Sequence, residues 1–201
     1  MEPDNTDPVD RAIARLYRSV VAVSPRDYRE WALNSLKKII PHDFAIWGSG
    51  NWEERRFHTL TTTGVGPEIQ QVLESTADEN PLIQALIASP PDQPMTMESV
   101  MPDREFYRSR LYKTTFAPYG IERLMSTLHL DRRSGLYSLV SLYRSDREKP
   151  FTAQEQAAQR RLTYHLFHGI SHSFFIHLAR TLRDRPPGSA AAAVDNAGRY
   201  H

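Results

Sequence analysis

Apolar positions follow helical spacing at both ends of the chain and form strand-like runs between them. Near the N-terminus, residues 8–20 and 25–40 carry apolar side chains three and four positions apart, which predicts two amphipathic helices. Each helix starts with a capping residue followed by proline, at Asp7, Pro8, Ser24 and Pro25. We therefore expect two helices before the first strand.

The middle of the chain predicts two strands followed by short helices. Residues 44–48 are apolar on both faces, as in a central strand, and residues 56–63 are rich in β-branched side chains. Beyond them the periodicity predicts three short helices and one edge strand. The helices are expected over residues 68–77, from Pro81 and from Asp103, and the edge strand over 95–97.

A hairpin and a long helix complete the pattern. Two strand-like runs, 121–130 and 136–143, flank residues 131–135, whose Asp, Ser and Gly favour a hairpin loop. Thr152 and Glu155 then form the signature of a capping box, in which each side chain bonds the backbone N–H of the other. A long amphipathic helix should follow.

This order of elements predicts an α/β (α+β) fold. We expect an antiparallel sheet of about five strands with helices on both faces. Helices from the two termini should pack on one face, and the middle helices should roof the other, where a small ligand could bind. Residues 1–183 are expected to form this domain, and residues 184–201 a linker and the start of a following segment.

Composition and charge narrow the functional classes. The chain has 201 residues, no cysteine and a net charge of +1. The lack of cysteine excludes disulfides and thiolate ligands. No apolar run reaches the roughly 18–20 residues that span a bilayer, and no signal peptide opens the chain, so we expect a cytoplasmic protein without membrane contact. The basic residues are scattered, which does not favour a DNA-binding surface on this chain.

Motifs for catalysis are absent from the sequence. It contains no Gly-x-Ser-x-Gly, phosphate-binding loop or His-Glu-x-x-His motif, so we expect neither an enzyme nor a cofactor. His165, His168 and His172 share one side of the last helix at spacings that metal ligands use. The same stripe is typical of a polar or subunit-facing surface, and without neighbouring acidic residues we expect no metal.

The hairpin strands place small hydroxyl groups between large apolar side chains. This pattern is typical of a pocket floor in which a few polar groups orient an apolar ligand, and it also fits a half-exposed face without ligand. Met125, Thr127 and His129 share one face of the first strand, while Ser138 and Tyr143 are candidates on the second. Aromatic residues that could form pocket walls, or plain core, are Trp47, Phe106, Tyr107, Tyr112 and Phe116.

The last helix is apolar on more than one side. Apolar residues form one stripe at four-residue steps, further apolar residues lie off that stripe, and such a helix needs two partners. One partner is its own sheet, and we expect the other to be a second subunit in a twofold homodimer. The predicted interface residues are Leu162, Leu166, His168, Ile170 and Phe175.

Several segments together resemble the N-terminal sensor region of LuxR-type transcriptional regulators. They are residues 116–121, the hairpin 124–143, the Pro-Phe-Thr-x-x-Glu sequence at 150–155 and the leucine-marked helix that follows. The resemblance covers roughly residues 8–200. It implies a GAF-like fold, a sensory and dimerising role, and DNA contact only through a domain beyond His201.

The best-known ligands of that family are acyl-homoserine lactones. Their receptors carry an Asp-Pro pair and a glycine after an aromatic residue. Tyr119 and Gly120 match, but Asn80 stands at the aspartate position and accepts an amide N–H more weakly than a carboxylate, and 56–63 lacks the expected Trp-x-x-x-Tyr. An unknown small ligand, a ligand-free dimerisation module and a lactone receptor stay open.

The residues and the resemblance together give one set of predicted ligand contacts: Trp47, His58, Asn80, Phe106, Tyr107, Tyr112, Phe116, Met125, Thr127, His129, Ser138 and Tyr143.

Overall fold

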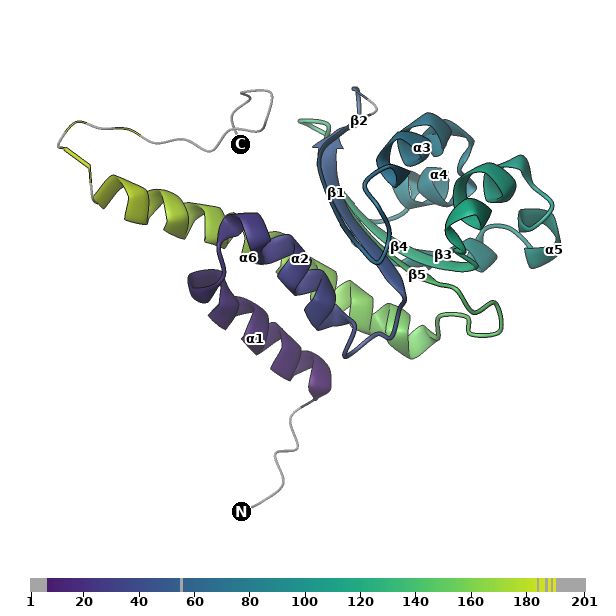
Figure 1. The fold of residues 1–201 in the computed structure, drawn as a ribbon, viewed down its shortest axis with the longest axis horizontal. Coiled ribbons are helices and arrows are strands. Elements are labelled where there is room, and N and C mark those ends of the chain that lie inside the picture. The colour runs from purple at the N-terminus through teal and green to yellow at the C-terminus, as the bar shows by residue number, and fades with distance from the viewer. Residues whose placement is uncertain (1–6, 55, 184, 187, 189, 191–201) are drawn as a thin grey trace, which may run out of the picture.

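The computed structural model describes residues 7–54, 56–183, 185, 186, 188 and 190. These residues form a five-stranded sheet, which lies between two layers of helices (Figure 1). The strand order is β2-β1-β5-β4-β3, and every neighbouring pair is antiparallel. The strands are β1 (Phe44–Asn51), β2 (Arg56–Thr63), β3 (Met95–Thr96), β4 (Arg123–Leu130) and β5 (Leu136–Arg144). The predicted antiparallel sheet with helices on both faces is confirmed.

The terminal helices cover one face of the sheet. These are α1 (Pro8–Ala22), α2 (Pro25–Leu36) and the long α6 (Ala153–Arg183), whose last turns extend beyond the sheet in Figure 1. The side chains of Asp7 and Ser24 accept backbone N–H groups at the starts of α1 and α2, as the capping signals predict. The second helix ends at Leu36, earlier than the predicted range 25–40, since only a turn follows it.

Short helices cover the opposite face. They are α3 (Ile69–Thr76), η1 (Ala77–Glu79), α4 (Pro81–Ala88), η2 (Met97–Ser99), α5 (Asp103–Phe106), η3 (Tyr112–Phe116) and η4 (Ala117–Tyr119). The helix predicted to start at Asp103 ends at Phe106. The Ser109 hydroxyl accepts the backbone N–H of Tyr112, the residue at which the π-helical turn η3 begins.

The long helix α6 packs within its own chain against α1 and α2 as well as against the sheet. Leu162 and Leu166 are fully buried and Ile170 is 8% exposed, in a core that α1, α2 and the sheet share. Their assignment to a subunit interface is corrected, because α1 and α2 supply the second partner that the apolar pattern required. His168 and Phe175 do lie exposed on the outer side of α6.

Candidate ligand-binding cavity

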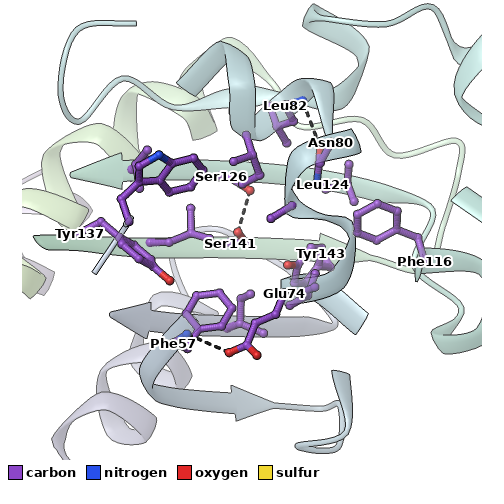
Figure 2. A pocket seen from close by; sticks show the side chains of 17 residues that line it. Phe57, Glu74, Asn80, Leu82, Phe116, Leu124, Ser126, Tyr137, Ser141 and Tyr143 are labelled. Atoms are coloured by element: carbon purple, nitrogen blue, oxygen red, sulfur yellow. Dashed lines mark hydrogen bonds between the residues drawn. The ribbon is translucent and has the colours of Figure 1, made fainter. Parts of the chain in front are cut away.

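A cavity lies on the sheet face that α3, η1 and α4 cover, away from α6. Its floor is formed by alternate side chains of the two central hairpin strands, where Ser126 pairs with Ser141 across β4 and β5. Their hydroxyl oxygens are 2.7 Å apart and both residues are buried (Figure 2). Because side chains alternate along a strand, the positions two residues before and after these serines also face the cavity.

The walls of the cavity are largely apolar. Phe57 reaches in from β2, and it can do so because Gly48 of the neighbouring strand has no side chain. A Cβ at Gly48 would lie 2.3 Å from the Phe57 ring. The remaining lining residues are Ile46, Trp52, Leu73, Glu74, Ala77, Asn80, Leu82, Ile83, Phe116, Leu124, Leu128, Tyr137, Leu139 and Tyr143.

The cavity is small in this conformation. Its volume is about 60 Å³. Pockets that enclose drug-sized ligands measure roughly 300–1,000 Å³. A ligand of that size therefore requires the covering helices α3 and α4 to move outward, or their side chains to rotate.

Asn80 supplies a directional polar group at the cavity. Its side-chain oxygen accepts the backbone N–H of Leu82 at 3.0 Å and so caps α4. The residue is 6% exposed, and within the described part of the chain its side-chain nitrogen makes no hydrogen bond. That NH₂ group can therefore donate to a carbonyl of a bound molecule.

The other polar groups at the cavity are held by the protein itself. Glu74 accepts hydrogen bonds from the Phe57 backbone N–H at 2.8 Å and from Gln70 at 3.0 Å. Burial, and to a smaller extent the Glu74 charge, raise the pKa of Tyr137, while burial raises that of Tyr143. Both phenols stay protonated at neutral pH, so the cavity offers hydroxyl groups rather than fixed charges on the floor.

Comparison with known proteins identifies the fold. The sequence matches no protein-family model and no curated protein. The VqsR ligand-binding domain from Pseudomonas aeruginosa superposes with a TM-score of 0.59 and 14% identity, over 83% of this chain and 96% of that chain. CepR2, an N-acylhomoserine lactone dependent LuxR-family transcription factor from Burkholderia cenocepacia, superposes with a TM-score of 0.57 and 13% identity, over 85% of this chain and 98% of that chain. A phycoerythrobilin-bound GAF domain from a cyanobacterial phytochrome superposes with a TM-score of 0.53 and 12% identity, over 86% of this chain and 99% of that chain.

The fold is GAF-like. It is shared with ligand-binding domains of LuxR-family regulators, as the sequence resemblance implied. In the GAF-like cavity of this chain, three of the predicted ligand contacts come together: Asn80, Phe116 and Tyr143. Their role in binding stays a prediction.

Three further predicted residues pack beside the GAF-like cavity without lining it. Phe106 contacts Phe116 and Tyr112, with ring centroids 5.9 and 5.1 Å apart. The hydroxyls of Tyr107 and Tyr112 donate to the backbone and the carboxylate of Glu122. Burial and the hydrogen bond to Glu122 raise the pKa of Tyr112 to about 12. These side chains brace the wall rather than form it.

The other six predicted contacts do not line the GAF-like cavity, which corrects the single site expected from the sequence. They are Trp47, His58, Met125, Thr127, His129 and Ser138. Trp47 is fully buried on the sheet face that α1, α2 and α6 cover, and its indole N–H donates to the Ser138 hydroxyl at 2.9 Å. His58 and His129 instead bond the carboxylates of Glu54 and Asp92, each at 3.0 Å.

Most of the lining residues were not predicted from the sequence, because strand alternation alone does not tell the two faces of the sheet apart. Alternation along the strands places Ser126 on one face with Leu124 and Leu128, and Ser141 on one face with Tyr143, but does not show which face points toward the short helices. Pairing of the strands through the 131–135 loop already places Ser126 opposite Ser141. Two small hydroxyls in direct register were the signal that identifies the floor.

The histidine stripe of α6 is built into aromatic contacts. The Tyr17 hydroxyl lies 3.0 Å from His165, and the His168 ring lies 4.3 Å from that of Tyr164. Among the described residues no group of three or more His, Cys, Asp or Glu is placed to hold a metal ion. Within the same residues, no helix has the length and apolar character that crossing a membrane requires.

Proposed function

We propose that this chain is the sensory domain of a bacterial LuxR-type transcriptional regulator. It binds a small, largely apolar molecule and thereby controls an attached DNA-binding domain. The observation that carries the proposal is the cavity itself, with apolar walls around a few buried polar groups on a GAF-like sheet. The ligand-binding domain of VqsR and the lactone-dependent CepR2 share the fold. The proposal assigns no catalytic step.

The small volume of the cavity links ligand binding to a change in conformation. A ligand larger than the present cavity binds only conformers in which α3 and α4 have moved outward. It favours those conformers by its differential affinity, because a ligand can shift a population only by that difference. The signal to the attached domain is then the change in these populations.

Native mass spectrometry of the purified chain tests the cavity as a binding site. We expect a co-purified small molecule in the wild type and its loss in Ala77→Phe, because the new ring occupies the cavity that Ala77 lines. Ala88→Phe is the matched control, since Ala88 is exposed at the end of α4 and does not line the cavity. It should retain the molecule.

The identity of any bound molecule separates the remaining interpretations. A lactone mass would support an acyl-homoserine lactone receptor, which the position of Asn80 at the start of α4 favours. Absence of a bound molecule in the wild type, or equal binding by Ala77→Phe, would contradict the cavity proposal. That result would support the ligand-free dimerisation module, which the small cavity volume favours.

The proposal includes a homodimer formed through exposed apolar residues of α6. Phe175 is 70% exposed and Tyr164 is 49% exposed on the outer side of the helix. We expect Phe175→Asp to lower the molecular mass in sedimentation equilibrium from dimer to monomer, because a buried unpaired carboxylate opposes association.

His177→Asp is the control for that change, because His177 is exposed on the same helix two residues further, on a different side. It should leave the dimer intact. A dimeric mass for Phe175→Asp, or a monomeric wild type at micromolar concentration, would contradict this part of the proposal.

A further inference from the structure

A second hollow lies on the opposite face of the sheet from the first cavity. It is a groove of about 470 Å³ between the ends of β1 and β5 and the second half of α6. Its apolar wall is formed by Phe167, Phe174 and Leu178 of α6, and Phe175 stands at its rim. Its polar side carries Arg29 and Ser138. Apart from Phe175 at its rim, which the proposed dimer uses, the α6 wall of this groove and Arg29 have no part in the proposed sensory function.

Arg29 is held in place by uncharged groups. Its Nη1 donates to the Thr59 hydroxyl at 2.6 Å and its Nη2 to the Ser49 hydroxyl at 3.1 Å. The guanidinium also lies 5.2 Å from the centre of the Trp47 ring, a cation–π arrangement. The polar network continues from Ser49 to Ser138, whose hydroxyl oxygens are 3.0 Å apart. The cation is thus oriented by neighbours that do not neutralise it.

No carboxylate balances this charge in the part of the chain that the structure describes. Arg29 forms no ion pair there, and it uses two hydrogen bonds although a guanidinium carries five N–H donors. Burial lowers the pKa of Arg29 to about 10, which leaves it charged at neutral pH. A half-buried cation without a counter-ion is costly, and an anion in the groove would remove that cost.

We propose that the groove binds a small amphiphilic carboxylate, with the anion on Arg29 and the apolar body against Phe167, Phe174 and Leu178. Arginine pairs with a carboxylate through two parallel N–H···O bonds, which suits the donors that Arg29 has left. The aromatic and aliphatic wall suits a hydrocarbon rather than a second polar group.

The charges around the groove favour a ligand with one negative charge over a ligand with two. Besides Arg29 and Tyr137, whose phenol burial keeps protonated at neutral pH, the groove is lined by the titratable side chain of His58. Its Nε2 is already bonded to the Glu54 carboxylate at 3.0 Å. A single arginine with an acidic residue nearby does not balance a doubly charged phosphate. A monocarboxylate matches the site in both charge and shape.

Isothermal titration of the full chain with dodecanoate, below its critical micelle concentration, tests the proposal. We expect binding that weakens by about tenfold or more in Arg29→Gln, because a charge-assisted pair is lost, and much less in Arg29→Lys. Dodecanol, which has no charge, should show no difference between wild type and Arg29→Gln.

A second variant avoids the buried network altogether. Ser171 is exposed on α6 and lines the groove, so Ser171→Trp fills it without disturbing the core and should abolish dodecanoate binding. Ala77→Phe, which blocks the first cavity, should leave the affinity for dodecanoate unchanged.

Three results would overturn the proposal. One is no heat of binding with wild type, and another is equal affinity in wild type, Arg29→Gln and Ser171→Trp. The third is a second copy of the chain as the occupant. In that case Arg29→Gln and Ser171→Trp would lower the sedimentation mass, while dodecanoate would not bind.

Discussion

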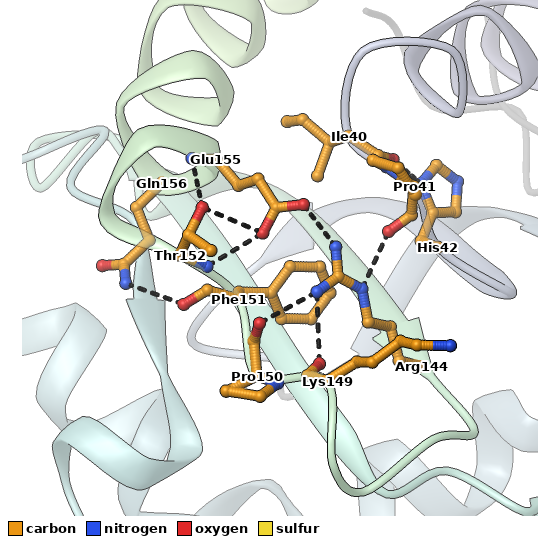
Figure 3. Close-up of polar contacts among 10 residues, drawn as sticks. All are labelled: Ile40, Pro41, His42, Arg144, Lys149, Pro150, Phe151, Thr152, Glu155 and Gln156. Carbon is orange, nitrogen blue, oxygen red and sulfur yellow. Dashed lines mark hydrogen bonds and ion pairs between the residues drawn. The ribbon is translucent and has the colours of Figure 1, made fainter.

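Replacing Arg144 by methionine is expected to lower the free energy of unfolding by about 3–5 kcal/mol. Arg144 is 8% exposed at the end of β5. Its guanidinium donates to the carbonyl oxygens of Pro41, Lys149 and Pro150 at 2.9, 3.1 and 3.0 Å, and to the Glu155 carboxylate (Figure 3). Methionine leaves all four acceptors without this donor, three of them in backbone that joins separate elements.

Chemical denaturation measures the loss, with Arg133→Met as the control. Arg133 is exposed in the hairpin loop, so the same change there should alter stability by less than about 0.5 kcal/mol. Equal stability of Arg144→Met and wild type would show that the contacts of Arg144 contribute nothing net.

The pKa of Glu155 gives an independent readout of the same contact. Burial raises this pKa, but hydrogen bonds from Thr152 and Arg144 outweigh burial and hold it below its ordinary value. In Arg144→Met the pKa should therefore rise. An NMR titration of the Glu155 side chain would detect the change, and a constant pKa would argue against the pair.

Gly169→Ala should destabilise the chain by about 1–3 kcal/mol, although alanine is a better helix former than glycine. A Cβ at Gly169 would lie 2.1 Å from the hydroxyl oxygen of Tyr28, which is itself fully buried. Tyr28 cannot withdraw, because α2 fixes it between α6 and the rest of the core.

A double-mutant cycle with Tyr28→Phe isolates this overlap. The Tyr28 hydroxyl is buried without a hydrogen-bond partner among the described residues, so its removal alone should be neutral or stabilising. In the Tyr28→Phe background, Gly169→Ala should cost much less, with a coupling energy of about 0.5–3 kcal/mol. Additive effects of the two changes would refute the steric explanation.

The local features of the fold were predictable because short sequence motifs encode them. Asp131 accepts the N–H of Arg133 and Gly135 adopts a φ of 72°, as the hairpin signal indicates. Thr152 and Glu155 bond each other's backbone N–H groups at 3.2 and 2.8 Å, which confirms the capping box. Each feature depends on residues a few positions apart.

The site was less predictable because it depends on choices that no local motif settles. A shift of one residue along a strand moves every side chain to the other face of the sheet. Thr127 and Ser126 therefore lie on opposite faces although they are neighbours in the sequence. The register of β1 and β2 shifts between Ser49 and Gly50, which sends Phe57 into the cavity and His58 toward α6. Likewise, the number of apolar sides on α6 indicates how many structural elements it packs against, but does not identify those elements.

The length of α6 has a mechanical consequence. At 1.5 Å per residue, its 31 residues make a rod of about 46 Å, anchored at one end by the sheet and reaching past it at the other. Such a rod is a lever. A tilt of about 5° at the anchored end would carry the far tip through about 4 Å, so small adjustments around the sheet become displacements that a neighbouring domain can register.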